Sequence, residues 1–163
     1  MDMNAPLNDQ LALTREIAAT PDTVWDLWTT ADGISRWWAP DGFRTDVSTI
    51  DVTEGGDLVY TMTAVDPAQV AFMEQHGLPL ATESRKRFTE VARPQRLGYV
   101  SLVDFVPGTE PYEHLTTVDL SPTDSGTLVT MTIDPMHDEE WTQRIVAGRA
   151  NELDNLARLV ERG

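Results

Sequence analysis

Hydrophobic and polar residues alternate along some stretches of this chain and recur at helical spacing along others. Residues 11–17, LALTREI, alternate almost one by one, which is typical of a strand with one buried face. The next stretch, PDTVWDLWT, has apolar residues at helical spacing. It follows Thr20, a residue type that caps helices, and starts with Pro21, which fits the first helical position. A strand followed by a short helix is therefore expected.

A second short helix and a series of strands are predicted next. The helix runs through DGISRWW and must end near Ala39, because the residue before Pro40 is pushed away from helical geometry. FRTDVSTIDV and GDLVYTMTAV are rich in β-branched and aromatic residues, and the TEGG between them is typical of a hairpin. Four more strand-like runs, SRKRFTEVA, RLGYVSLVDFV, YEHLTTVDL and GTLVTMTID, are separated by turn residues. A meander of neighbouring antiparallel strands is the simplest arrangement.

Two further helices complete the pattern. Residues 66–82 are expected to form an inserted helix and its return loop, with Asp66 as the cap. A long helix is predicted at residues 138–161, where apolar residues recur at helical spacing and the acidic start complements the helix dipole. Its apolar stripe is interrupted in the middle, where Gly148 or Arg149 occupies a position that a large apolar residue could have taken. This interruption predicts a gap beneath the helix.

The predicted fold is α+β. It is a strongly curved antiparallel sheet of about seven strands around a long C-terminal helix, with two short helices after the first strand and an inserted helix after the third. A chain of 163 residues with 40% hydrophobic residues can bury a sizeable core. We therefore expect a single domain over residues 1–163, with residues 1–10 set apart as a candidate flexible N-terminal segment.

The composition of the chain restricts the classes of partner and site that we expect. The 12 Lys and Arg residues against 27 Asp and Glu residues give a net charge of −15, which repels phosphate, so neither nucleic acid nor a membrane is expected as a partner. The absence of cysteine excludes disulfides, thiol nucleophiles and thiolate metal sites. No apolar run approaches the roughly 20 residues of a membrane span. The N-terminus lacks the blocks of a secretory signal, so a cytoplasmic location is expected.

The common signatures of metal and nucleophilic sites are missing. His76, His114 and His137 are the only histidines, and none has a second histidine at the spacing of a metal ligand. The chain contains no Gly-x-Ser-x-Gly elbow and no glycine-rich phosphate loop with its lysine. We therefore expect no metal, no cofactor and no catalytic residue of these kinds.

Five stretches carry a resemblance to a known family: ATPDTVWDLWTTADGISRWWAPDGF (19–43), GGDLVY (55–60), EVARPQRLGYV (90–100), GTLVTMTI (126–133) and EEW (139–141). The chain resembles the START-like (SRPBCC) helix-grip superfamily, in the branch similar to the C-terminal domain of the activator of the heat-shock protein 90 ATPase. The resemblance runs from about Leu11 to Val160. It implies a curved sheet that grips the terminal helix, often with a cavity between them, and no shared catalytic apparatus. Lipid carriers, receptors, aromatases and stress-response proteins share this fold, so fold alone does not give function.

Two pairs of large side chains are candidates for a cavity wall. Adjacent side chains on a helix point about 100° apart, so one apolar face cannot take both Trp37 and Trp38. Either both rings are structural, or one is core and the other covers the mouth of the space under the terminal helix. Phe72 and Met73 would form an adaptable lid if they turn inward. The alternative is a surface helix whose apolar stripe packs down, and both interpretations leave Phe72 buried.

Strand alternation predicts polar groups on the inner face of the sheet. The inward positions are Tyr99, Ser101, Val103 and Phe105 on one strand and Tyr112, His114, Thr116, Val118 and Leu120 on the next. The same rule puts Lys86, Phe88 and Glu90 together, with Phe88 inside. An apolar cavity with a polar end suits an amphipathic molecule. In the alternative, the sheet frays and His114 meets water.

The leading hypothesis is non-catalytic binding of a small hydrophobic or amphipathic molecule between the sheet and the terminal helix. The expected cavity residues are Trp37, Trp38, Tyr60, Met62, Phe72, Met73, Phe88, Tyr99, Ser101, Tyr112, His114, Thr116, Met131, Trp141 and Ile145. A chaperone-associated or other protein-interaction module is the first alternative, and it predicts an exposed apolar patch. A cyclase- or hydrolase-type enzyme that uses His114 with Tyr112 or a Glu is the second. A homodimer and a chaperone contact stay open as further partners.

Overall fold

The computed structural model describes residues 10–39, 41–104 and 106–162. The elements are β1 (Leu11–Ile17), α1 (Pro21–Thr29), α2 (Ala31–Trp37), β2 (Phe43–Ile50), β3 (Asp57–Ala64), α3 (Pro67–Gln75), β4 (Ala81–Ala92), β5 (Arg96–Val103), β6 (Tyr112–Thr123), β7 (Gly126–Ile133) and α4 (Glu139–Arg162). Their order is the one that the sequence pattern predicts. The expected flexible segment at residues 1–10 lies, apart from Gln10, outside the described residues, and so does Phe105.

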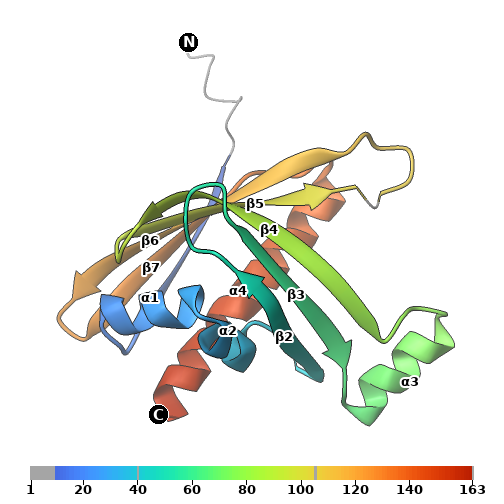
Figure 1. The fold of residues 1–163 in the computed structure, drawn as a ribbon, viewed down its shortest axis with the longest axis horizontal. Coiled ribbons are helices and arrows are strands. Elements are labelled where there is room, and N and C mark those ends of the chain that lie inside the picture. The colour runs from blue at the N-terminus through green and yellow to red at the C-terminus, as the bar shows by residue number, and fades with distance from the viewer. Residues whose placement is uncertain (1–9, 40, 105, 163) are drawn as a thin grey trace.

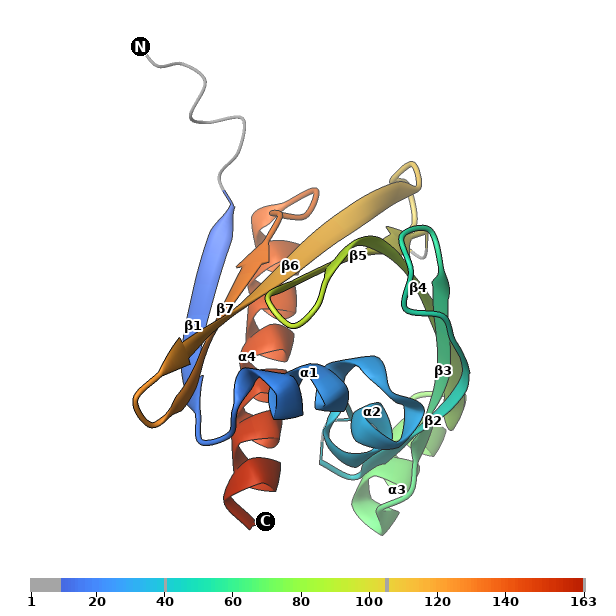
Figure 2. The same ribbon diagram turned by 60° about the vertical axis from the view of Figure 1, so that its left-hand side comes forward.

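All the strands belong to one antiparallel sheet with the order β1-β7-β6-β5-β4-β3-β2. The strands β2 to β7 form the predicted meander. β1 lies at the edge of the sheet next to β7 and pairs with it from Leu11 opposite Ile133 to Ile17 opposite Thr127. Figures 1 and 2 show a strongly curved sheet, with α1, α2 and α4 on its concave side. The α+β prediction is thereby confirmed.

Polar side chains cap the helices, and the sequence predicts two of these caps, Thr20 and Asp66. Thr20 and Thr30 accept backbone N–H groups at the starts of α1 and α2. Asp66 caps α3, and the Asp138 carboxylate accepts the Trp141 N–H at 2.8 Å at the start of α4. Each such cap is worth about 1 kcal/mol, so these residues fix where the helices begin.

Both tryptophans of the Trp37–Trp38 pair belong to the core, with 3% and 1% of their surfaces exposed. The Trp37 ring meets Trp28 edge-on at 4.8 Å between centroids, and its indole N–H donates to the Leu27 carbonyl at 2.8 Å. Trp38 reaches the inner face of the sheet, where it contacts Tyr60. Because each ring has its own set of neighbours, the two satisfy separate parts of the core.

A bulge in β4 overturns one expectation. The register of β4 against β5 shifts between Phe88 and Glu90, so the extra residue Thr89 reverses the alternation of inner and outer positions. Thr89 Oγ1 lies 2.8 Å from where a Cβ would stand on Gly98, so a side chain at that position would force Thr89 to shift. Phe88 is buried and Glu90 is exposed. The expectation that Glu90 shares a face with Lys86 is wrong for this reason.

The expectation of a buried Phe72 is also wrong. Half of Phe72 is exposed, and its ring lies 4.2 Å from that of His76 on the same helix. The pairing of β3 with β4 extends to Thr63 opposite Ala81, so the connecting helix α3 begins beyond the end of the ladder. Figure 1 shows α3 at the tips of β3 and β4, away from α4. It therefore forms no lid over the concave face, and Met73, which it also carries, is only half-buried.

Candidate functional site

The sheet forks where β4 and β5 separate. Their pairing runs from Ala92 opposite Arg96 to Lys86 opposite Ser101 and ends there among the described residues. Beyond this point β4 continues along β3 alone and β5 along β6 alone, and Figure 1 shows the two strands diverging. A groove of about 880 Å³ opens in the fork. It is lined by Asp57, Tyr60, residues 82–87, residues 100–104, Glu113, His114, Met136, Ile145 and Arg149.

Three polar side chains lie in a row across the base of this fork. Lys86 on β4 is the cross-strand neighbour of Ser101 on β5, and Ser101 is the neighbour of His114 on β6. Lys86 and His114 are buried, and the Lys86 ammonium donates to Ser101 Oγ at 2.7 Å. The predicted inward placement of Ser101 and His114 follows from this register, and the alternative of a frayed sheet with His114 in water is wrong.

His114 is held as a neutral side chain. Its Nε2 lies 2.6 Å from the carbonyl oxygen of Asp134. Because a carbonyl only accepts, this contact assigns the proton to Nε2 and leaves Nδ1 as an acceptor. Burial lowers the pKa of His114, the nearby charges of Arg149 and Lys86 lower it further, and the hydrogen bond to Asp134 opposes the shift.

Arg149 forms the α4 side of the groove. It is 5% exposed, its Nη1 pairs with Glu152 at 3.1 Å, and its Nη2 donates to Thr116 Oγ1 at 3.3 Å. Arg149 Nε and Glu152 Oε1 have no hydrogen-bond partner in the described part of the chain. Sequence reasoning noted Arg149 only as a gap in an apolar stripe. The signal that could have identified it as part of a buried polar site was the presence of a charged residue at a core-facing position of the helix.

An aromatic wall backs the polar row. The Lys86 ammonium lies 5.9 Å from the ring centroid of Tyr60 and 5.7 Å from that of Tyr99, within the range of cation–π attraction. Trp38 packs against both tyrosine rings from the core side. Burial raises the pKa of Tyr99, so its hydroxyl stays protonated. Trp28 Nε1 lies beside this hydroxyl without reaching hydrogen-bond geometry, and neither atom has another partner among the described residues.

Tyr112 belongs to a different cluster. Its hydroxyl lies 2.7 Å from His137 Nδ1 and accepts the His137 backbone N–H at 3.2 Å. The His137 ring in turn lies 5.8 Å from that of Trp141. His114 contacts Asp134 instead, and no described contact joins it to Tyr112. Tyr112 was one of the two partners that the enzyme hypothesis offered for His114, the other being a Glu.

The predicted cavity residues thus fall into three groups. Tyr60, Ser101, His114 and Ile145 line the groove itself. Trp38, Tyr99 and Thr116 are buried and contact residues that line it, and Phe88 is buried in the core. The others lie elsewhere: Trp37, Met62 and Met131 in or against the core, Tyr112 and Trp141 beside His137, and Phe72 and Met73 on α3. The sequence did not name Lys86, Val103, Met136 or Arg149 as cavity residues, although alternation had placed Lys86 beside Phe88.

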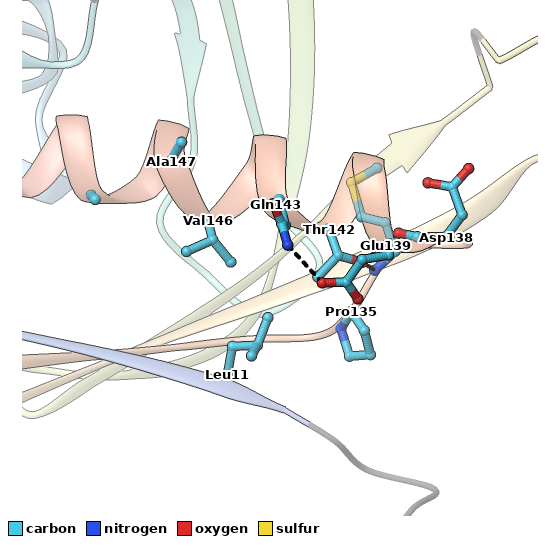
Figure 3. Close-up of a pocket in the computed structure, with 10 residues that line it drawn as sticks. Leu11, Pro135, Asp138, Glu139, Thr142, Gln143, Val146 and Ala147 are labelled. Atoms are coloured by element: carbon cyan, nitrogen blue, oxygen red, sulfur yellow. Dashed lines mark hydrogen bonds between the residues drawn. The ribbon is translucent and has the colours of Figure 1, made fainter.

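A second groove, of about 710 Å³, lies between the start of β1 and the first turns of α4. Figure 3 shows Leu11 and Val146 on its two sides and the hydrogen bond from Gln143 to Glu139. Its buried hydroxyl, on Thr142, already accepts from Met136 N–H and donates to the Asp138 carbonyl. Because its polar group is satisfied, this groove offers less to a ligand than the fork does.

The described residues form neither a metal-binding cluster nor a membrane-spanning helix. They contain no group of three histidine or acidic side chains arranged to hold a metal ion. None of the helices they form is both long enough and apolar enough to cross a membrane.

Solved structures share this fold. A protein of Chromobacterium violaceum superposes with a TM-score of 0.72 at 21% identity, over 94% of this chain and 98% of that one. An AHSA1-like protein from Aeromonas hydrophila gives 0.71 at 24% identity, over 94% and 92%. An AHSA1 protein from Silicibacter pomeroyi gives 0.71 at 19%, over 93% and 97%. Identities this low establish a common fold and nothing finer. No curated protein matches the chain.

A family model matches most of the chain. It is described as Activator of Hsp90 ATPase homolog 1-like protein and covers residues 18–161, from just before α1 almost to the end of α4. The match agrees with the solved structures and confirms the resemblance found in the sequence. The chain therefore belongs to the Activator of Hsp90 ATPase homolog 1-like protein family.

Proposed function

We propose that this protein binds a small amphipathic molecule in the groove between the forked sheet and α4, in the cytoplasm and without catalysing a reaction. The observation that carries the proposal is a groove that combines an apolar wall with buried polar groups. Its volume of about 880 Å³ lies within the range of about 300–1,000 Å³ typical of small-molecule sites.

An unsatisfied polar atom of a residue that lines the groove supports a bound molecule at this place. Arg149 lines the groove, and its buried Nε has no hydrogen-bond partner among the described residues. Leaving such a group unpaired costs about 1–3 kcal/mol, so a ligand that supplies partners is stabilised by satisfying them. The side chains of Val103 and Ile145 offer apolar contact to the rest of the molecule.

A thermal-shift screen with lipids and aromatic metabolites tests this function. A ligand present at about 100 times its dissociation constant adds about 2.7 kcal/mol to the unfolding free energy. In a domain of this size that corresponds to a rise of about 5–10 °C in Tm. Ser101→Trp, which fills the groove, is expected to abolish the shift, while Leu128→Trp on the exposed side of β7 keeps it.

The control separates groove binding from surface binding. Circular dichroism first establishes that both variants are folded. A library in which no compound class raises the Tm of the wild-type protein would contradict the proposed function. A shift that survives in Ser101→Trp would contradict the groove as the site.

A second candidate function is a protein-interaction module that contacts a chaperone. The observation that favours it is an exposed apolar segment around α3, in which Val65, Phe72, Leu78 and Leu80 are 48%, 50%, 46% and 36% exposed. Large apolar side chains gathered in one exposed segment are typical of a contact surface. This function uses α3 rather than the groove, so the two candidates are independent of each other.

A further inference from the structure

Lys86 stands apart from every other cation of the protein. It is the single lysine in the chain, and it is 7% exposed, at the base of the groove where β4 leaves β5. A buried ammonium is unfavourable unless hydrogen bonds and an opposite charge compensate for the lost water. The burial of this lysine therefore bears on the chemical class of ligand that the groove binds.

No carboxylate of the described chain pairs with Lys86. The flanking arginines of β4 both have one: Arg85 lies 3.1 Å from Asp57, and Arg87 lies 2.8 Å from Glu113. Even the buried Arg149 has Glu152. The Lys86 ammonium has Ser101 Oγ and the faces of two tyrosine rings instead. In a chain of net charge −15, a buried cation without an acidic partner is an exception.

The polar atoms left over in the groove are mostly donors. A lysine ammonium has three N–H bonds, and one of them is used by Ser101. Ser101 accepts that bond and keeps its own hydroxyl proton to donate. Arg149, which also lines the groove, has a further donor at Nε without a partner among the described residues. A surplus of donors fits a ligand group that only accepts, such as a carboxylate.

The net charge of the buried groups also favours a negatively charged ligand group. Lys86 and Arg149 each carry one positive charge, Glu152 carries one negative charge, and His114 is kept neutral by burial. One positive charge is therefore uncompensated, and a single carboxylate balances it. At the rim, Asp57 and Glu113 are paired with arginines, whereas Glu83 and Asp104 are exposed side chains that solvent and salt screen.

We infer that the groove takes an amphiphile with a carboxylate head group, which Lys86 and Ser101 bind at the fork, with its apolar part along Tyr60, Val103 and Ile145. This inference rests on the proposed function and adds the chemical class of the ligand. Lys86 supplies the charge, and Ser101 orients the ammonium.

Three probes with one tail and different head groups test it: decanoate, 1-decanol and decyltrimethylammonium. Dissociation constants are measured by isothermal titration calorimetry below the concentrations at which these compounds form micelles. A charge-assisted hydrogen bond in a buried site is expected to make decanoate bind the wild-type protein about tenfold or more tightly than 1-decanol. The cation is expected to bind weakest of the three.

Lys86→Met keeps most of the apolar stem and removes the charge. It is expected to remove the preference for decanoate while binding 1-decanol within about twofold of the wild type. Arg44→Met is the matched control, because it causes the same change in net charge on the exposed edge strand β2, where Arg44 pairs with Asp46. It should keep the preference. Lys86→Gln serves as a second variant if Lys86→Met does not fold.

The outcomes separate the inference from the function beneath it. Equal binding of the three probes to the wild-type protein overturns the carboxylate inference and leaves amphiphile binding intact. A preference that persists in both Lys86 variants overturns the role of Lys86. If none of the three probes binds, the inference is overturned. The proposed function is then decided by the uncharged and aromatic compounds of the thermal-shift screen.

Discussion

The protonation of His114 is set by its burial at the base of the fork. The folded state holds its pKa below the ordinary value of 6.5, because the charged form loses water and lies near Arg149 and Lys86. Well above pH 6.5 the side chain is neutral in both the folded and the unfolded chain. As the pH falls below 6.5, the unfolded chain takes up the proton first, so stability is lost toward the folded pKa.

Replacement of His114 by Gln should therefore flatten the pH dependence of stability. Urea unfolding at pH 7.5, 6.5 and 5.5 measures this, with the free energy of unfolding falling less in His114→Gln than in the wild type. His76→Gln is the control, since His76 is exposed, and it should keep the wild-type slope. Equal slopes for all three proteins would show that His114 does not titrate as its surroundings require.

At the scale of elements, α4 shows how one helix serves both core and groove. Its apolar residues Leu153 and Leu156 are buried in the core, and Arg149, one turn before Leu153, is buried and lines the groove. Gly148 lies beside it on the exposed side, where a Cβ would meet no other atom within 4 Å. Glycine inside a helix costs about 1 kcal/mol relative to alanine.

Gly148→Ala is therefore expected to raise the free energy of unfolding by about 0.5–1 kcal/mol, measured from the midpoint of urea denaturation. Gly126→Ala is the contrasting variant. Its Cβ would lie 2.1 Å from the Ile17 carbonyl oxygen, so it must displace backbone and should destabilise the protein. A loss of stability in Gly148→Ala would mean that the helix is not free to accept a methyl group there.

The elements could be predicted because their signals are local. Thr20 and Asp66 cap helices through atoms two or three residues away, and the spacing of apolar positions reports which face is buried. The bulge at Thr89 could not be predicted in the same way, because it is a shift in register against the neighbouring strand β5. Alternation is correct up to Phe88 and reversed after it.

The candidate site was only partly predictable for the same reason. Alternation placed Ser101 and His114 inside, because each lies on a regular stretch of strand. The end of the β4–β5 ladder at Lys86 depends on how two hairpins diverge, which no local pattern encodes. Arg149 was misjudged because the pattern alone does not distinguish a charged residue that fills a groove from a gap in a stripe.

At the scale of the whole molecule, the two candidate functions use different side chains of the β3–β4 hairpin. The groove is lined by Asp57, Tyr60 and residues 82–87 of its strands, and the exposed apolar segment lies around α3 at its tip. Phe72 and Leu78 do not line the groove, so substitutions there test the second function separately.

ATP turnover by a bacterial Hsp90 chaperone tests the second candidate. If α3 is the contact, the wild-type protein changes the rate, and Phe72→Ser combined with Leu78→Ser reduces the effect at least severalfold. Leu128→Ser, which changes an exposed leucine on β7, should act like the wild type. A rate that the wild-type protein does not alter would eliminate this candidate.

The fork also has a mechanical consequence. Beyond Lys86 and Ser101 no ladder joins β4 to β5 among the described residues, so no β4–β5 backbone hydrogen bonds tie the two hairpins together at the groove. A change in the width of the entrance then requires bending of the hairpins and no repacking of the tryptophans beneath. We expect such bending to let the groove accept molecules of different width.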